Sequence, residues 1–239
     1  MGNEVKPQGV LLVVSGPSGA GKGTICGMLR EQLPDLGYSV SVTTRQPRVG
    51  EVDGVNYFFK TVDEVKEMIA NDEFLEYAEV YGNYYGTPRQ FVMEQLNSGK
   101  DVLLEIDIQG ALQVKEHFPD GVFVFITPPS LDELCARIYK RGTDSEEVIK
   151  RRMASAADEL TYASKYDYII VNDIAEKATQ KVLTVMEAER YRVARTYFII
   201  DEICKLKLDL EKCKPSKDKE WYKMSMVDPS IDYLAEKVD

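Results

Sequence analysis

A glycine-rich turn directly follows an apolar run near the start of the chain. The run is VLLVVS at 10–15, and the turn is GPSGAGKGT at 16–24. A short apolar run of this kind is typical of a strand that is covered on both faces. In a turn between such a strand and a helix, backbone N–H groups converge on a phosphate, and the helix beginning near Lys22 adds the positive end of its dipole. The pattern therefore predicts a phosphate-binding loop in an α/β fold.

The hydroxyl that usually completes this type of loop is displaced by one residue. The consensus G-x-x-x-x-G-K-[ST] is met as far as Lys22, but the next residue is Gly23, and Thr24 follows one position late. Because Mg²⁺ retains several waters and can be held mainly by nucleotide oxygens, we expect the phosphate site to survive, with no direct protein ligand to the metal. The residues expected to bind ATP here are Gly16, Pro17, Ser18, Gly19, Ala20, Gly21, Lys22, Gly23 and Thr24.

Three more apolar runs and several helix starts continue the pattern. The runs lie at 102–107, 122–127 and 166–171, and their near-continuous hydrophobicity is typical of a parallel sheet. A long amphipathic helix is expected over 174–214. Hydroxyl residues three positions before a Glu or Gln predict helix starts at Thr61, Thr87, Ser130 and Thr143. Strands alternating with helices predict a three-layer α/β fold around a central parallel sheet.

Two segments depart from this rhythm. Residues 41–99 are rich in Tyr and polar residues, and their turn residues predict small antiparallel strands with short helices, an insertion of the kind that carries specificity. The charged stretch at 137–152 predicts a mobile segment between two helices, or else an ordinary solvated helix surface.

Composition argues against several other classes of protein. The 239 residues carry a formal net charge of -10, which disfavours general affinity for nucleic acid or anionic lipid. No apolar stretch approaches the roughly 18 residues needed to cross a membrane, and the first residues lack the apolar core of a secretory signal. The four cysteines form no C-x-x-C pair and His117 is the single histidine, so we expect reduced thiols in a cytoplasmic protein without a zinc site.

Charged residues in three places are candidates for binding a ligand. Arg45 and Arg48 stand three residues apart around a proline, so both guanidinium groups can be aimed at one phosphate, unless they are simply solvated loop arginines. Glu76 lies between an apolar and an aromatic residue. Glu105 and Asp107 end a buried strand, where ligands bind in open parallel sheets.

Together these motifs resemble the guanylate kinase family over nearly all of residues 9–207. The matching segments, in chain order, are SGPSGAGKGT, SVSVTTRQPRVGEVDGVNYFF, EYAEVYGNYYGT, LLEIDIQGALQV, FITPPS, RGTDSEEVIKRR and YDYIIVND. Several separate motifs in one order are more specific than any single one. The resemblance implies a P-loop NTPase fold whose parts are a core at 9–40 and 100–207, a GMP-binding insertion at 41–99, a helical lid near 137–152, and a linker and tail at 208–239.

For the chemistry, the resemblance implies transfer of the γ-phosphoryl group of ATP to GMP or dGMP. Guanine presents N1–H and N2–H₂ donors beside its O6 acceptor, so Glu76 would accept both donors while the hydroxyls of Ser41 and Thr87 face O6. Tyr57 and Tyr85 would hold the phosphate, unless they are amphipathic core aromatics. The residues that the resemblance places in the GMP site are Ser41, Arg45, Arg48, Glu51, Tyr57, Glu76, Tyr85, Thr87, Glu105 and Asp107.

The resemblance also implies a lid that closes over the polyphosphate. Arg137, Arg141 and Arg152 would belong to this lid, and Asn172 would lie near the adenine, unless it only ends a strand. A loose phosphoryl-transfer transition state calls mainly for positioning and positive charge. The expected catalytic residues are Lys22, Arg48, Arg141 and Arg152, with Mg²⁺ bound mainly through ATP phosphates and water.

Two other functions stay open at this point. GAGKGT also resembles the loop of adenylate kinases, although the arginine pair and the carboxylates disfavour another monophosphate kinase. The second is a non-catalytic guanylate-kinase-like interaction domain, which the intact Lys22 disfavours. We expect a monomer or homodimer that binds small molecules and neither nucleic acid nor membrane. The final stretch, 226–239, resembles the start of the bacterial RNA polymerase omega subunit, or is a tail without function.

Overall fold

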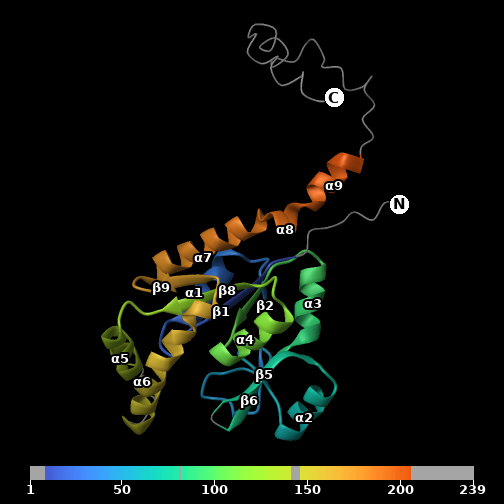
Figure 1. Ribbon diagram of the computed structural model, residues 1–239. Helices are drawn as coiled ribbons and strands as arrows, with labels where there is room; N and C mark the ends of the chain where they lie inside the picture. Colours follow the sequence, from blue (N-terminus) through green and yellow to red (C-terminus); the bar gives the residue numbers. More distant parts are fainter. Residues whose placement is uncertain (1–8, 81, 141–145, 206–239) are drawn as a thin grey trace, which may run out of the picture. The chain divides into compact units, whose positions relative to one another are not determined.

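The computed structural model describes residues 9–80, 82–140 and 146–205 (Figure 1). The chain divides into two units, and the first, which ends at Thr196, contains both β-sheets. The predicted tail, with its omega-like stretch, lies outside the described residues. Within the described ranges, no helix is long and apolar enough to cross a membrane.

The central sheet has five parallel strands in the order β2-β7-β1-β8-β9. All four strands predicted from the apolar runs are confirmed. The fifth, β2, was not predicted, because two residues are too short to leave an apolar run. The strands are β1 (Leu11–Ser15), β2 (Gly37–Tyr38), β7 (Val102–Glu105), β8 (Val122–Thr127) and β9 (Tyr168–Val171).

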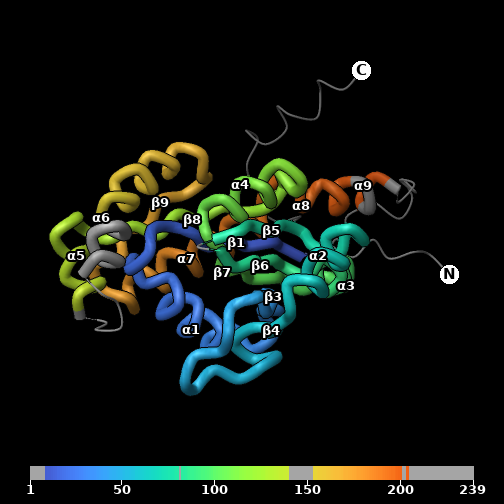
Figure 2. The backbone as a smooth tube through the Cα atoms, turned by 90° about the horizontal axis from the view of Figure 1, so that it is seen from below, coloured from blue at the N-terminus to red at the C-terminus, as the bar shows by residue number. Residues whose placement is uncertain are grey.

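Helices cover both faces of this sheet, so the predicted three-layer fold is confirmed. Leu12 and Val14 of β1 pack into one buried cluster with α1 and α7, whereas Leu11 and Val13 pack into a second with α3 and α4. Figure 2 shows α1 and α7 on one side of β1 and β8, with α4 on the other. The helices are α1 (Lys22–Gln32), α3 (Arg89–Asn97), α4 (Ile108–His117) and α7 (Ala175–Arg190).

The inserted segment forms a second, four-stranded sheet in the order β4-β3-β6-β5. The prediction of antiparallel strands is confirmed for β3 with β6 and for β5 with β6, but β3 and β4 are parallel. They are parallel because the chain between them returns to the starting edge before β4 begins. The elements are β3 (Val42–Thr43), β4 (Phe58–Phe59), α2 (Val62–Ala70), β5 (Phe74–Val80) and β6 (Asn83–Pro88).

The predicted helix starts have mixed outcomes. Thr61 forms a full capping box at α2, and the Ser130 hydroxyl accepts the Glu133 N–H at 3.1 Å where α5 (Leu131–Lys140) begins. The prediction at Thr87 is wrong, because Thr87 lies in β6 and α3 begins two residues later. Thr143 lies outside the described residues, ahead of α6 (Glu146–Thr161), which is followed by the 3₁₀ turn η1 (Tyr162–Lys165).

The helical stretch predicted over 174–214 is helical as far as Lys205 but is divided among three helices, and 206–214 lie outside the described residues. α7 ends at Arg190, and α8 (Val193–Thr196) and α9 (Phe198–Lys205) follow as separate helices. A polar cluster lies at the break: the buried Glu189 carboxylate accepts the Tyr168 hydroxyl at 2.6 Å and lies 3.3 Å from Arg192. Apolar periodicity carries no signal for this polar cluster.

Candidate active site

The phosphate loop, residues 16–21, joins the end of β1 to the start of α1. Gly16, Gly19 and Gly21 have φ angles of 140°, 90° and 93°, in the region that favours glycine. A Cβ atom at Gly16 would overlap the carbonyl oxygen of Ile126 at the end of β8. The loop therefore bends tightly over the carboxyl edge of the sheet, with the N-terminus of α1 directly after it, which is the geometry of an anion site.

Lys22 places its ammonium group over this loop. Its Nζ donates to the carbonyl oxygens of Gly16, at 2.6 Å, and Pro17, at 3.1 Å. Burial lowers the pKa of Lys22, while the charges of Glu105 and Glu159 act in the opposite direction. The lysine is thus a half-buried cation that is held by two carbonyls and attracted by carboxylates from two other elements.

Asn172, expected at ATP, is bonded to the loop, and Arg137, also expected at ATP, is bonded to Asn172. The Asn172 side chain is only 4% exposed, and its Nδ2 donates to the Ala20 carbonyl at 2.7 Å. Arg137 donates to the Asn172 backbone carbonyl at 3.0 Å and pairs with Glu133 at 2.8 Å. Both side chains therefore have partners within the protein, and neither lines the cavities described below.

A cavity of about 240 Å³ lies between the two sheets, beside the loop lysine. Most of the residues predicted for the GMP site line it, whereas the predicted Arg45, Arg48, Glu51 and Thr87 do not. The lining residues are Lys22, Ser41, Tyr57, Glu76, Val80, Tyr85, Glu105, Ile106 and Asp107. The two sheets thus bring carboxylates, hydroxyls and one ammonium group into a single small space.

Glu76 is the most deeply buried acid of this cavity. The register of β5 and β6 pairs it with Thr87, whose hydroxyl donates to its Oε1 at 2.6 Å. Burial raises the pKa of Glu76 to about 7, although the hydrogen bonds from Thr87 act in the opposite direction. A Cβ atom at Gly110 of α4 would overlap Oε2, so glycine is needed there. Glu76 is therefore a rigidly held acid that ionises near neutral pH.

This bond gives Thr87 a partner within the protein. A hydroxyl group has a single hydrogen to donate, and in Thr87 that hydrogen goes to Glu76. The Thr87 hydroxyl therefore cannot donate to a purine O6 while the bond holds. Its observed role is to orient the carboxylate, whereas Ser41 does line the cavity.

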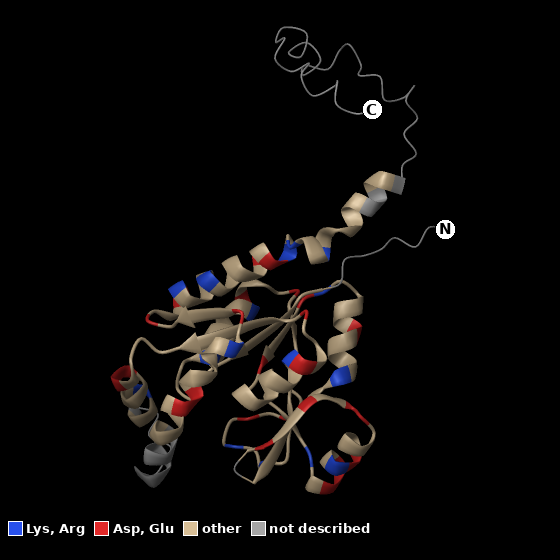
Figure 3. Cartoon of the chain, viewed as in Figure 1, with Lys and Arg blue, Asp and Glu red and all other residues tan. Residues whose placement is uncertain are grey.

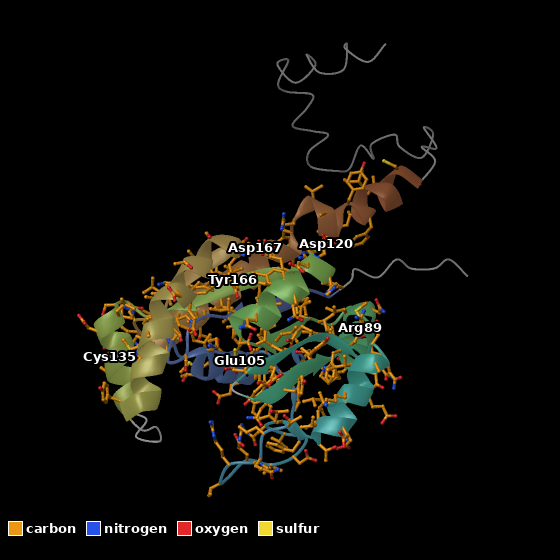
Figure 4. All side chains as sticks on the ribbon, turned by 60° about the horizontal axis from the view of Figure 1, so that its bottom comes forward. Arg89, Glu105, Asp120, Cys135, Tyr166 and Asp167 are labelled. Atoms are coloured by element: carbon orange, nitrogen blue, oxygen red, sulfur yellow. The ribbon has the colours of Figure 1, made fainter. Side chains whose placement is uncertain are left out.

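Two further carboxylates lie at the end of β7. Asp107 is the N-cap of α4 and accepts the Gly110 N–H at 2.8 Å. Glu105 projects toward the start of α1, where a Cβ atom at Gly23 would lie 3.3 Å from its Oε1 (Figure 4). The space that a larger residue would need at position 23 is thus bordered by the Glu105 carboxylate, while Thr24 is exposed in the first turn of α1.

The predicted arginine pair is connected through Glu51. Its Oε1 pairs with the Arg45 guanidinium at 2.9 Å, and its Oε2 accepts the Arg48 backbone N–H at 2.7 Å. These bonds raise the pKa of Arg45 and lower the pKa of Glu51. Arg45 also lies 5.4 Å from the centre of the Tyr57 ring, which in turn contacts Tyr85 edge to face. Glu51 therefore shapes the arginine loop, beside two tyrosines that do line the cavity.

A larger cavity of about 850 Å³ is also lined by Lys22. It shares Lys22, Val80 and Asp107 with the smaller cavity, so the two cavities adjoin at these residues. Its far wall is α6, whose acidic positions are red in Figure 3. Sequence reasoning missed this wall, because charges on an amphipathic helix give no sign of what they face. The lining residues are Gly16, Ser18, Lys22, Glu79, Val80, Asp107, Ile108, Gln109, Leu112, Ser155, Asp158, Glu159 and Tyr162.

The predicted lid is described only in part. Arg141 lies outside the described residues, and for Arg152 the structure describes the backbone in α6 but not the side chain. Of the predicted lid, the structure describes the end of α5 and the backbone at the start of α6. Leu134 and Ile138 of α5 border Gly19 of the phosphate loop.

Comparison with known proteins identifies the family. The model of the family described as guanylate kinase matches residues 8–189. A guanylate kinase from Caldanaerobacter subterraneus subsp. tengcongensis is 60% identical over 191 residues, which cover 80% of this chain and 93% of that protein. A guanylate kinase from Desulfitobacterium hafniense is 55% identical over 195 residues, covering 82% and 98%.

A solved structure agrees with these relatives. The crystal structure of guanylate kinase from Anaplasma phagocytophilum has a TM-score of 0.67 and 35% identity, and the match covers 80% of this chain and 90% of that one. The family predicted from the sequence motifs is therefore confirmed. This chain belongs to the guanylate kinase family.

Proposed function

We propose that this chain transfers the γ-phosphoryl group of ATP to the phosphate of GMP, which gives ADP and GDP. The observation that carries the proposal is the meeting of two cavities at Lys22. One holds a buried carboxylate suited to a guanine base, and the other begins at the phosphate loop. We propose that GMP occupies the first and the ATP polyphosphate the second, so that their phosphates meet beside the lysine.

Glu76 is proposed to select the base. When ionised, its two oxygens can accept the N1–H and N2–H₂ groups of guanine, while the Ser41 hydroxyl donates to O6. Adenine would bring an unprotonated N1 toward the carboxylate and an amino donor to the O6 position. Each buried group left unpaired in this way costs roughly 1–3 kcal/mol, which is about ten- to hundredfold in affinity.

The phosphate of GMP is proposed to bind between the arginine loop and the two tyrosines. Arg45 is held in place by Glu51 and by the Tyr57 ring, which fixes the direction of its guanidinium before the ligand arrives. Arg48 is held by its backbone and can turn its side chain toward the same phosphate. Two guanidinium groups can then neutralise a dianion through paired hydrogen bonds.

Lys22 is proposed to stabilise the transferring group. In the structure its three N–H donors face two loop carbonyls and the cavity, so a bound polyphosphate can replace those carbonyls as acceptor. Positive charge in a desolvated site stabilises the charge that spreads over the equatorial oxygens during transfer. Arg48 and the lid arginines Arg137, Arg141 and Arg152 are proposed to add charge and exclude water when the lid closes.

Mg²⁺ is proposed to bind together with ATP. The residues around Gly23 show which groups the protein offers to the ion. The loop offers no hydroxyl there, and among the described residues no group of three or more His, Cys, Asp or Glu side chains could hold a metal alone. Glu105 and Asp107 do border the cavity and can accept hydrogen bonds from metal-bound water. When bound through the ATP oxygens, the ion would neutralise phosphate charge. The reaction and its compartment, the cytoplasm, remain our proposals.

The proposal predicts a strong preference among acceptors. With ATP and Mg²⁺ in a coupled assay, GMP should be phosphorylated at least about a hundredfold more efficiently than AMP, because adenine mismatches both Glu76 and Ser41. CMP and UMP run in parallel should also be poor acceptors. Comparable efficiency with AMP would contradict the assignment of the base site and favour an adenylate kinase activity.

Removing the loop ammonium should abolish most of the catalysis. Lys22→Ala is expected to lower kcat by about 10²–10³-fold or more, since it removes the central transition-state donor, while the Kd for GMP changes little. Lys60→Ala, which removes an exposed lysine outside both cavities, is the matched control. Near-normal turnover of a folded Lys22→Ala protein would reject the catalytic role.

Binding of the guanine base should depend on pH through Glu76. Because the free-protein pKa is about 7, only about a tenth of Glu76 is ionised at pH 6, so guanosine should bind about tenfold more weakly there than at pH 8. Guanosine is the ligand of choice because it has no titrating phosphate. Glu76→Gln should bind it weakly with a flat pH profile.

Ionisation of Glu76 should favour guanosine binding but lower the stability of the free protein. The pKa of Glu76 in the folded protein is about 7, above the ordinary value of about 4.5 for a free Glu, so ionising Glu76 costs stability as the pH rises from about 4.5 to 7. Glu76→Gln should therefore be relatively more stable at pH 8 than at pH 4.5 in urea unfolding. If the difference in unfolding free energy between the two proteins did not change with pH, the raised pKa of the buried Glu76 carboxyl would be contradicted.

A further inference from the structure

We infer that Asn172 is a positioning residue that aims the backbone N–H of Gly21 at the bound polyphosphate, instead of contacting the adenine. The inference deepens the proposed function. It rests on one part of that proposal, which is that the loop binds polyphosphate. It assigns a purpose to a buried amide at the end of β9 that no catalytic role accounts for.

The end of β9 fixes the Asn172 backbone. Its N–H donates to the Thr127 carbonyl at 2.8 Å, which continues the pairing of β8 with β9 by one residue. Its carbonyl accepts the Arg137 guanidinium at 3.0 Å. Because both its backbone groups are bonded, the backbone of Asn172 is held in place, and its side chain reaches the loop from that position.

The Asn172 side chain then fixes one peptide unit of the loop. Its Nδ2 donates to the Ala20 carbonyl at 2.7 Å. Because a trans peptide is planar, its C=O and N–H bonds point in opposite directions. Holding the Ala20 carbonyl toward Asn172 therefore turns the Gly21 N–H away from Asn172, and this N–H immediately precedes the N-terminus of α1.

Packing around Gly21 supports this reading. A Cβ atom at Gly21 would overlap the Asn172 Nδ2, and the φ of 93° also favours glycine. The loop approaches Asn172 so closely that the Asn172 side chain is left 4% exposed. A side chain so enclosed has almost no surface to offer a purine, whereas it is well placed to hold a backbone.

The contacts that hold Asn172 extend to α5. Arg137, which bonds the Asn172 carbonyl, is itself paired with Glu133 at 2.8 Å. From the same helix, Leu134 and Ile138 border Gly19. Asn172 thus lies between the phosphate loop and the helix that leads into the proposed lid.

Binding of inorganic tripolyphosphate separates the two roles, because this ligand has no base. In calorimetric titrations of the full chain, Asn172→Ala should weaken the binding of tripolyphosphate and of ATP alike, by about ten- to hundredfold, while the affinity for GMP is unchanged. Asn97→Ala, the same change at an exposed position of α3, should alter none of the three. Loss of ATP affinity with unchanged tripolyphosphate affinity would overturn the inference and assign Asn172 to the adenine.

Asn172→Asp provides a variant of nearly the same shape. It keeps the packing but replaces the Nδ2 donor with an acceptor oxygen. This variant should therefore also lose affinity for tripolyphosphate and ATP while binding GMP normally. In ¹⁵N–¹H spectra, the Gly21 resonance should shift in the free variant and lose its response to tripolyphosphate. Retention of the unaltered Gly21 response in both variants would overturn the inference. If the unaltered chain binds GMP but no tripolyphosphate, the inference falls together with the proposed phosphate site.

Discussion

The close approach of the phosphate loop to the strands beside it is the constraint on which the site depends. Gly16 borders the backbone of β8, and Gly21 borders Asn172 at the end of β9. At such distances the loop carbonyls are within reach of fixed donors, and Lys22 and Asn172 supply them. The Ala20 carbonyl, held toward Asn172, turns the N–H of the same peptide away from Asn172. The glycine pattern therefore serves backbone orientation as much as flexibility.

The second constraint is electrostatic and centres on Lys22. A buried ammonium is costly, and here two carbonyls offset part of the cost while Glu105 and Glu159 attract the charge from two sides. The two cavities meet at this cation, so phosphates entering from either side approach the same charge. Glu76, which lines the smaller cavity, is held away from solvent by α4 and by Thr87. Lys22 and Glu76 thus line one pocket, which suits a nucleotide with a base and a phosphate.

The sequence predicted the elements whose signal is local and missed those that depend on tertiary contacts. All four strands that were found have nearly continuous apolar runs, although β9 is partly exposed. The loop glycines indicate positive φ angles, which the structure shows. The helix start predicted at Thr87 was wrong, because the local pattern of a hydroxyl three residues before a Gln does not show that Thr87 pairs with Glu76 across β5 and β6. The acidic wall of α6 and the contact of Asn172 with the loop could not be found, because each joins segments far apart in the chain.

A dinucleotide that joins adenosine and guanosine through five phosphates tests most directly whether the two cavities hold the two substrates end to end. The account predicts that one molecule fills both cavities across Lys22, so calorimetry should give one molecule per chain and an affinity at least about a hundredfold above that of GMP. Both ATP and GMP should displace it. An affinity no higher than that of GMP, with displacement by only one of the two nucleotides, would contradict the account.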